Sequence, residues 1–158
     1  MYLYVDEYVS RKNYLTRQPG QEPEVNEAFK IIASLLPSSK HVREDDFAGF
    51  SVMVPVGYWR KANAIHGWIV DNCANGVDEC QEIIVSKEQL ENLYNDVVSV
   101  LEGKVLASEA SLEPRSGFFF GSTEMDDWYK NDLLYTRDLI KPLIDDPDIG
   151  YVIYQASW

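Results

Sequence analysis

The stretch Gly150-Tyr-Val-Ile-Tyr-Gln-Ala-Ser-Trp158 is rich in aromatic and β-branched residues and predicts a β-strand. A second stretch of the same character, Tyr2-Leu-Tyr-Val-Asp-Glu-Tyr-Val-Ser10, lies at the other end of the sequence. We expect these two strands to pair, because pairing would hold both ends of the chain in one sheet.

Few strands and several helices are predicted between these two stretches. Residues 50–56 are predicted to form a strand and residues 82–85 a short extended piece, whereas apolar spacing predicts helices over residues 24–36 and 58–73. Strands this few and this unevenly spaced favour an α+β fold. We therefore predict a single domain, residues 1–158, with a small antiparallel or mixed sheet packed with about four helices.

The two remaining helices have recognisable starts. Gln89 follows Ser86 by three residues, which predicts a capping box, and Gly103 is expected to end that helix. Its apolar stripe consists of Leu90, Leu93, Tyr94, Val97 and Leu101. A longer helix is predicted from a cap at Ser122 or Thr123 to about Ile144.

Composition limits the classes of partner. The net charge is −12, from 26 acidic and 14 basic residues, and this disfavours general binding to nucleic acid. Such acidity serves solubility or attracts a basic partner, for example a nucleic-acid-binding protein. Because no signal-peptide pattern and no membrane-length apolar stretch is present, we expect a cytoplasmic protein with Cys73 and Cys80 as thiols.

The segment 58–73 contains most of the candidate functional residues. His66 falls within the apolar arc of the predicted helix, so it is either a hydrogen-bonded core residue or a functional imidazole. Trp68 is nearly opposite that arc. It packs on a second element or forms an interaction patch with Arg60 and Lys61.

A second candidate segment is Gly117-Phe-Phe-Phe-Gly121, which precedes the last predicted helix. The phenylalanines are expected either to fill the core or to flank an anion site at the helix start. In the second case Gly121, Ser122 and Thr123 would bind a small anion, with Arg60 or Arg115 opposite. Trp59 and His66 would complete such a pocket.

No catalytic or metal-binding motif accompanies these candidates. The sequence contains no nucleophile-elbow pattern and no His-Glu-x-x-His pattern. The spacing of Cys73 and Cys80 matches no familiar zinc site, and the only histidines are His41 and His66. We therefore expect neither a metal nor a cofactor, and the protein is not predicted to be an enzyme.

Two segments together resemble a known family. They are Val56-Gly-Tyr-Trp-Arg-Lys-Ala-Asn-Ala-Ile-His66, followed by Trp68, and Gly117-Phe-Phe-Phe-Gly-Ser-Thr123. This pair resembles a family of small bacteriophage, prophage and bacterial proteins that are generally labelled uncharacterised. The resemblance covers roughly residues 54–145 and implies residence in a bacterial or infected-host cytoplasm. It brings no known site residues with it.

The sequence leaves two functional hypotheses. The first is a non-catalytic, acidic interaction protein, of the phage or bacterial origin that the resemblance implies, that binds a bacterial host protein or another copy of itself. The second is a protein that binds a small ligand or nucleotide, or an enzyme, with an Arg/Lys/His/Trp pocket near the helix start at Gly121–Thr123. An anionic small molecule is the partner expected by the second hypothesis.

Overall fold

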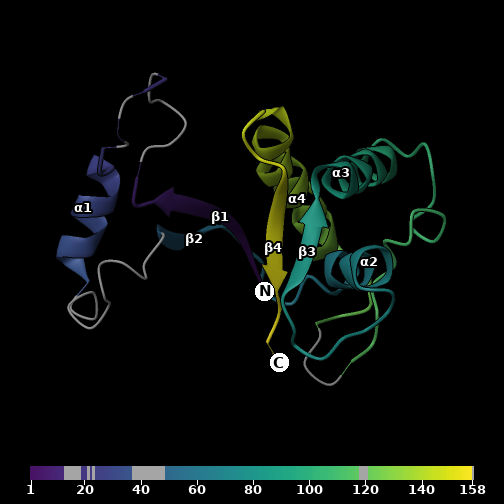
Figure 1. The fold of residues 1–158 in the computed structure, drawn as a ribbon. Helices are drawn as coiled ribbons and strands as arrows, with labels where there is room; N and C mark the ends of the chain where they lie inside the picture. The colour runs from purple at the N-terminus through teal and green to yellow at the C-terminus, as the bar shows by residue number, and fades with distance from the viewer. Residues whose placement is uncertain (13–18, 21, 23, 37–48, 118–120, 158) are drawn as a thin grey trace. The chain divides into compact units, whose positions relative to one another are not determined.

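The computed structural model describes residues 1–12, 19–20, 22, 24–36, 49–117 and 121–157 (Figure 1). The elements in chain order are β1 (Tyr2–Ser10), α1 (Glu27–Leu35), β2 (Gly49–Tyr58), α2 (Asn63–Cys73), β3 (Ile83–Ser86), α3 (Lys87–Leu101), α4 (Asp127–Asp145) and β4 (Tyr151–Gln155). The strands form one sheet in the order β2-β1-β4-β3. The predicted α+β class is confirmed. Among the described helices, none is both long and apolar enough to cross a membrane.

The first and last strands are neighbours in the sheet, as predicted. β1 pairs with β4 in antiparallel register, with Leu3 opposite Tyr154. β3 pairs antiparallel with the other edge of β4, with Val85 opposite Val152. β4 therefore lies inside the sheet, and its residues on one face are fully buried.

The described chain forms two compact units. The smaller unit is Asp6–Val54, and the larger one combines Met1–Val5 with Pro55–Trp158. Because β1 and β2 contribute residues to both units, the predicted single domain stays a prediction.

The smaller unit contains α1, which begins later than expected because Asn26 caps it. The Asn26 side chain accepts a hydrogen bond from the Ala28 N–H at 2.9 Å. One aromatic contact, between Phe29 and Phe50, has its ring centroids 4.8 Å apart. Residues 38–48, whose polar composition predicts a loop, lie outside the described residues.

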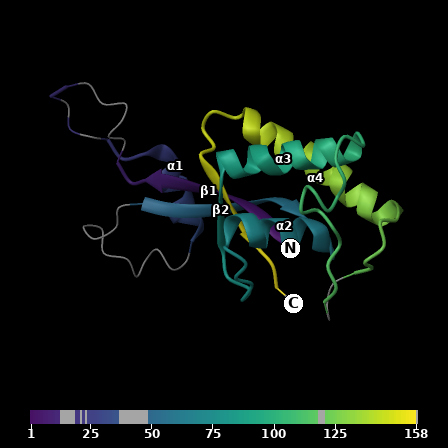
Figure 2. The ribbon, with the colours of Figure 1, turned by 90° about the vertical axis from the view of Figure 1, so that its right-hand side faces the viewer.

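The core of the larger unit lies between the sheet and helices α2, α3 and α4 (Figure 2). Alternation along β3 shows which face is covered: Ile83 and Val85 are buried, whereas Ile84 is 64% exposed. The largest fully buried side chains of this core are Leu3, Ile65, Ile69, Val85, Leu90, Leu93, Val97, Leu112, Leu133, Ile140, Val152 and Tyr154.

Helix α3 forms as its sequence predicts. The Ser86 hydroxyl accepts from the Gln89 N–H at 3.2 Å, and the Gln89 side chain accepts from the Ser86 N–H at 2.9 Å. This reciprocal pair is the predicted capping box. Gly103 has φ +68°, a left-handed conformation that ends helices and that glycine adopts without strain.

Two predicted helix boundaries are wrong. The helix expected from residue 58 begins at Asn63, because β2 continues through Tyr58 and Lys61 adopts φ +63°. The last helix begins at Asp127 rather than after Ser122 or Thr123. Its cap is Asp126, whose Oδ1 accepts from two successive backbone N–H groups at 3.0 Å each.

Candidate functional site

Two tryptophans among the candidate residues belong to the core. Trp59 is buried and its indole N–H donates to the Thr136 hydroxyl at 2.9 Å. Trp68 is 2% exposed, and its indole N–H donates to the Asp96 carboxylate at 2.8 Å. In this structure Trp68 joins α2 to α3 and is not available for a surface patch with Arg60 and Lys61.

His66 is also buried, and both of its ring nitrogens are engaged. Nδ1 lies 2.8 Å from the Tyr154 hydroxyl, and Nε2 lies 3.0 Å from Asp78 Oδ2. Burial raises the pKa of Tyr154, and the neighbouring Asp78 charge raises it further, so this phenol stays neutral. His66 thus connects α2 to β4 and to the segment before β3, away from the cavity described below.

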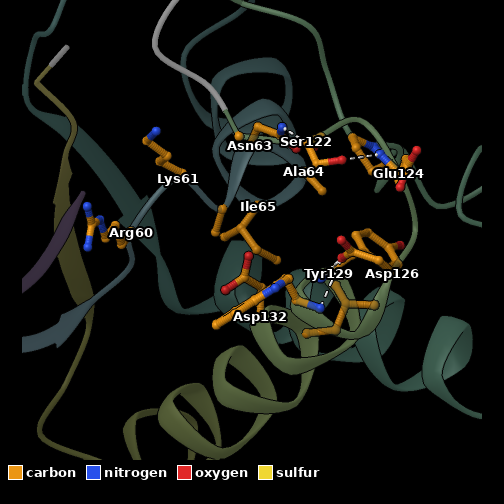
Figure 3. A pocket seen from close by; sticks show the side chains of 15 residues that line it. Arg60, Lys61, Asn63, Ala64, Ile65, Ser122, Glu124, Asp126, Tyr129 and Asp132 are labelled. Carbon is orange, nitrogen blue, oxygen red and sulfur yellow. Dashed lines mark hydrogen bonds between the residues drawn. The ribbon is translucent and has the colours of Figure 1, made fainter.

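Four other candidates, however, come together. Arg60, Lys61, Gly121 and Ser122 line a cavity of about 210 Å³ between the start of α2 and the start of α4 (Figure 3). Thr123 is exposed and is not one of the residues that line this cavity. The remaining lining residues are Ala62, Asn63, Ala64, Ile65, Pro114, Glu124, Asp126, Trp128, Tyr129, Asp132 and Leu133.

A tight turn between β2 and α2 forms one wall of the cavity. The Asn63 N–H donates to the Lys61 carbonyl at 2.8 Å, which closes a three-residue turn around Ala62. The Asn63 side-chain amide then donates to the Ser122 carbonyl at 3.1 Å. This bond fixes the segment around Ser122 beside α2. Ala62, the N-cap residue of α2, has no side-chain capping hydrogen bond.

The opposite wall carries carboxylates from α4 and the segment before it. Asp126 is occupied as the helix cap, but no described residue donates a hydrogen bond or forms an ion pair with the Asp132 carboxylate. Asp132 is half-buried. Burial, and then the negative charge of Asp126, raise the pKa of Asp132 to about 6.

The cations of the cavity do not neutralise this carboxylate. Arg60 and Lys61 are exposed, and neither forms an ion pair within the described part of the chain. Figure 3 shows their nitrogen ends directed away from Asp132. Arg115, by contrast, is paired: its Nη1 donates to Asp71 Oδ1 at 3.0 Å, and this contact lowers the pKa of the Asp71 carboxyl.

A groove of about 530 Å³ adjoins the cavity and shares Arg60, Lys61, Trp128 and Asp132 with it. Its other lining side chains are Tyr58, Trp59, Asn131 and Tyr135. The ring of Trp128 is unusually open to solvent, at 79% exposed. Tyr135 is held in place because its hydroxyl accepts from the Tyr58 N–H at 3.1 Å.

The site combines an aromatic side chain with a carboxylate that no described cation neutralises. Across the described residues, no three His, Cys, Asp or Glu side chains are grouped as metal ligands. An aromatic ring beside an unneutralised carboxylate is instead the arrangement that binds ammonium and guanidinium groups.

Sequence reasoning missed Trp128 and Asp132, which carry much of the chemistry of the cavity, whereas it named Asp126 among the acidic residues able to satisfy this helix start. The spacing of these residues places them on the first turns of α4, but only the correct helix start shows which side of the helix they occupy. Comparison of the chain with protein-family models, curated proteins and solved structures finds no match.

Proposed function

We propose that this protein is a non-catalytic binding protein whose cavity holds the positively charged group of a small organic ligand. The observation that carries the proposal is the half-buried Asp132 carboxylate, which has no cationic partner among the described residues. A carboxylate in that position repels anions and gains from an ammonium or guanidinium donor.

The walls of the cavity support a cationic ligand in two further ways. Trp128 and Tyr129 contribute aromatic side chains to the lining, and cations bind to the faces of such rings. The helix start that was expected to bind an anion is already occupied, because Asp126 accepts from its free N–H groups. An anion would therefore meet a carboxylate at that terminus.

The proposal is tested by calorimetric titration at about pH 7.5 with three ligands of similar shape: pentylamine, 1-pentanol and pentanoate. We expect pentylamine to bind with a Kd on the order of 1 mM, because one charge-assisted hydrogen bond and one cation–π contact are available. Pentanol and pentanoate should bind more weakly. The proposal fails if pentanol or pentanoate binds as tightly as pentylamine.

A matched pair of variants locates the binding. Asp132→Asn keeps the shape of the side chain and should weaken pentylamine at least tenfold, or about 1.4 kcal/mol. Asp138→Asn removes the same charge from an exposed position on the same helix, outside the cavity, and should leave the Kd within about twofold. If both variants lose pentylamine affinity equally, the loss comes from the overall charge of the protein and not from contact with Asp132.

A second candidate function is interaction with a protein, either a host protein or another copy of this chain. The observation that favours it is the exposed Trp128 ring beside Tyr58 and Tyr135, since aromatic residues dominate interface energies. Native mass spectrometry distinguishes self-association: a species of twice 18.1 kDa that Trp128→Ala abolishes would support it. Phage origin and a cytoplasmic location belong to this proposal.

A further inference from the structure

The cavity and the groove adjoin, and their shared lining carries charges of opposite sign. They share four lining residues, so the cavity and the groove are neighbours on the same surface. Asp132 supplies the negative charge, and Arg60 and Lys61 supply the positive charges. A ligand that extends from the cavity into the groove therefore meets both.

The two cations are held on the loop between β2 and α2. Lys61 has φ +63°, an uncommon conformation for a residue with a side chain, and the turn that follows it is closed by the Asn63 N–H. In a chain with 26 acidic and 14 basic residues, both cations lack an ion-pair partner in the described segments, although three carboxylates line the same cavity. This arrangement keeps their positive charge available to a ligand.

The groove also offers an apolar surface between the charges. Tyr58 is 51% exposed and Tyr135 is 42% exposed, and both line the groove with Trp128. Burying apolar ligand atoms against these rings is favourable, and Tyr135, whose hydroxyl accepts from the Tyr58 N–H, loses little freedom on binding. The Tyr58 N–H already donates to Tyr135, so a ligand is bound here by side chains and not by adding a strand to β2.

We propose that the ligand is a small zwitterion of the amino-acid class. Its ammonium group contacts Asp132, its carboxylate lies beside Arg60 and Lys61, and its apolar body packs on Trp128. This inference rests on the proposed function, because it adds an anion subsite to the cation site. The sequence led us to expect an anionic small molecule, and this proposal replaces it with a ligand that carries both charges.

The test compares pentylamine with 5-aminopentanoate, which has the same chain and amine but carries a carboxylate at the far end. In the wild-type protein at about pH 7.5, we expect 5-aminopentanoate to bind about tenfold tighter than pentylamine, the ratio given by one additional charge-assisted contact. In R60Q/K61Q this ratio should fall to about twofold or less. The control R137Q/K141Q removes the same charge from α4 residues that line neither the cavity nor the groove, and should keep the wild-type ratio.

The outcomes separate the two proposals. If pentylamine and 5-aminopentanoate bind the wild-type protein equally, the anion subsite is wrong and the cation site stands. If R137Q/K141Q lowers the affinity ratio of 5-aminopentanoate to pentylamine as much as R60Q/K61Q does, the ligand carboxylate responds to the overall charge of the protein. The proposed anion subsite is then also wrong. If neither amine binds, the proposed function itself is wrong. Circular dichroism of each variant confirms that it is folded before its ratio is used.

Discussion

Replacing Asp132 with asparagine is expected to stabilise the fold at neutral pH while it weakens ligand binding. The folded protein raises the pKa of this carboxyl from 3.8 to about 6, through burial and through the charge of Asp126. The folded state therefore holds the proton more tightly than the unfolded state. The stability that comes from the protonated form is complete below pH 3.8 and is lost as the pH rises through about 6.

The size of the effect follows from this difference. Above about pH 7, the difference between the folded and unfolded pKa values of Asp132 lowers the free energy of unfolding by at most about 3 kcal/mol. Because Asp132 is only half-buried, solvent screening reduces this value, and we expect about 1–1.5 kcal/mol. Removing that cost should raise the Tm of a domain of this size by about 3–5 °C.

The assay is urea unfolding of wild type and Asp132→Asn at about pH 7.5 and about pH 4. We expect the variant to be more stable by about 1–1.5 kcal/mol at the higher pH and nearly equal to wild type at the lower. Asp138→Asn, which is exposed, should show little dependence on pH. A variant that is destabilised at both pH values by the same amount would refute the reasoning.

Three further predictions concern the core. Trp68→Ala should cost about 3–5 kcal/mol in urea unfolding, because it leaves a cavity and an unpaired Asp96 carboxylate; a cost below about 1 kcal/mol would contradict the burial of Trp68. Thr136→Val should cost about 1–3 kcal/mol, because it keeps the volume and removes the acceptor of the Trp59 N–H; an equally stable variant would contradict that bond. Burial raises the pKa of Cys73 to about 11, so its alkylation by iodoacetamide in the folded protein should be at least about tenfold slower than in urea; equal rates, followed by mass spectrometry, would contradict its burial.

Local signals in the sequence predict much of the fold. The strand composition of the two terminal stretches and the capping box of Ser86 and Gln89 depend on neighbours within a few residues, and the structure confirms both. The starts of α2 and α4 could not be predicted in this way. Lys61 adopts a left-handed conformation that its residue type does not indicate, and Asp126 caps α4 although Ser122 and Thr123 are also suitable caps.

The candidate site was predicted in part. The sequence singles out Arg60, Lys61, Gly121 and Ser122, and the structure places all four on one cavity. His66 and Trp68 lie in the core because α2 is buried along most of its length. Side chains on nearly every side of this helix are therefore packed against other parts of the protein. The role of Asp132 depends on its burial and on the distance of other charges, and these are properties of the fold that no short pattern contains.

The most direct test of the central claim is the affinity of pentylamine for the wild-type protein, measured between about pH 5 and pH 8. Pentylamine stays protonated throughout this range, so any change of its affinity with pH comes from a titrating group of the protein. We predict a constant affinity above about pH 7 and a fall towards tenfold per pH unit below about pH 6, because Asp132 must be ionised to bind the amine. An affinity that is the same at pH 5 and pH 8 would contradict the account.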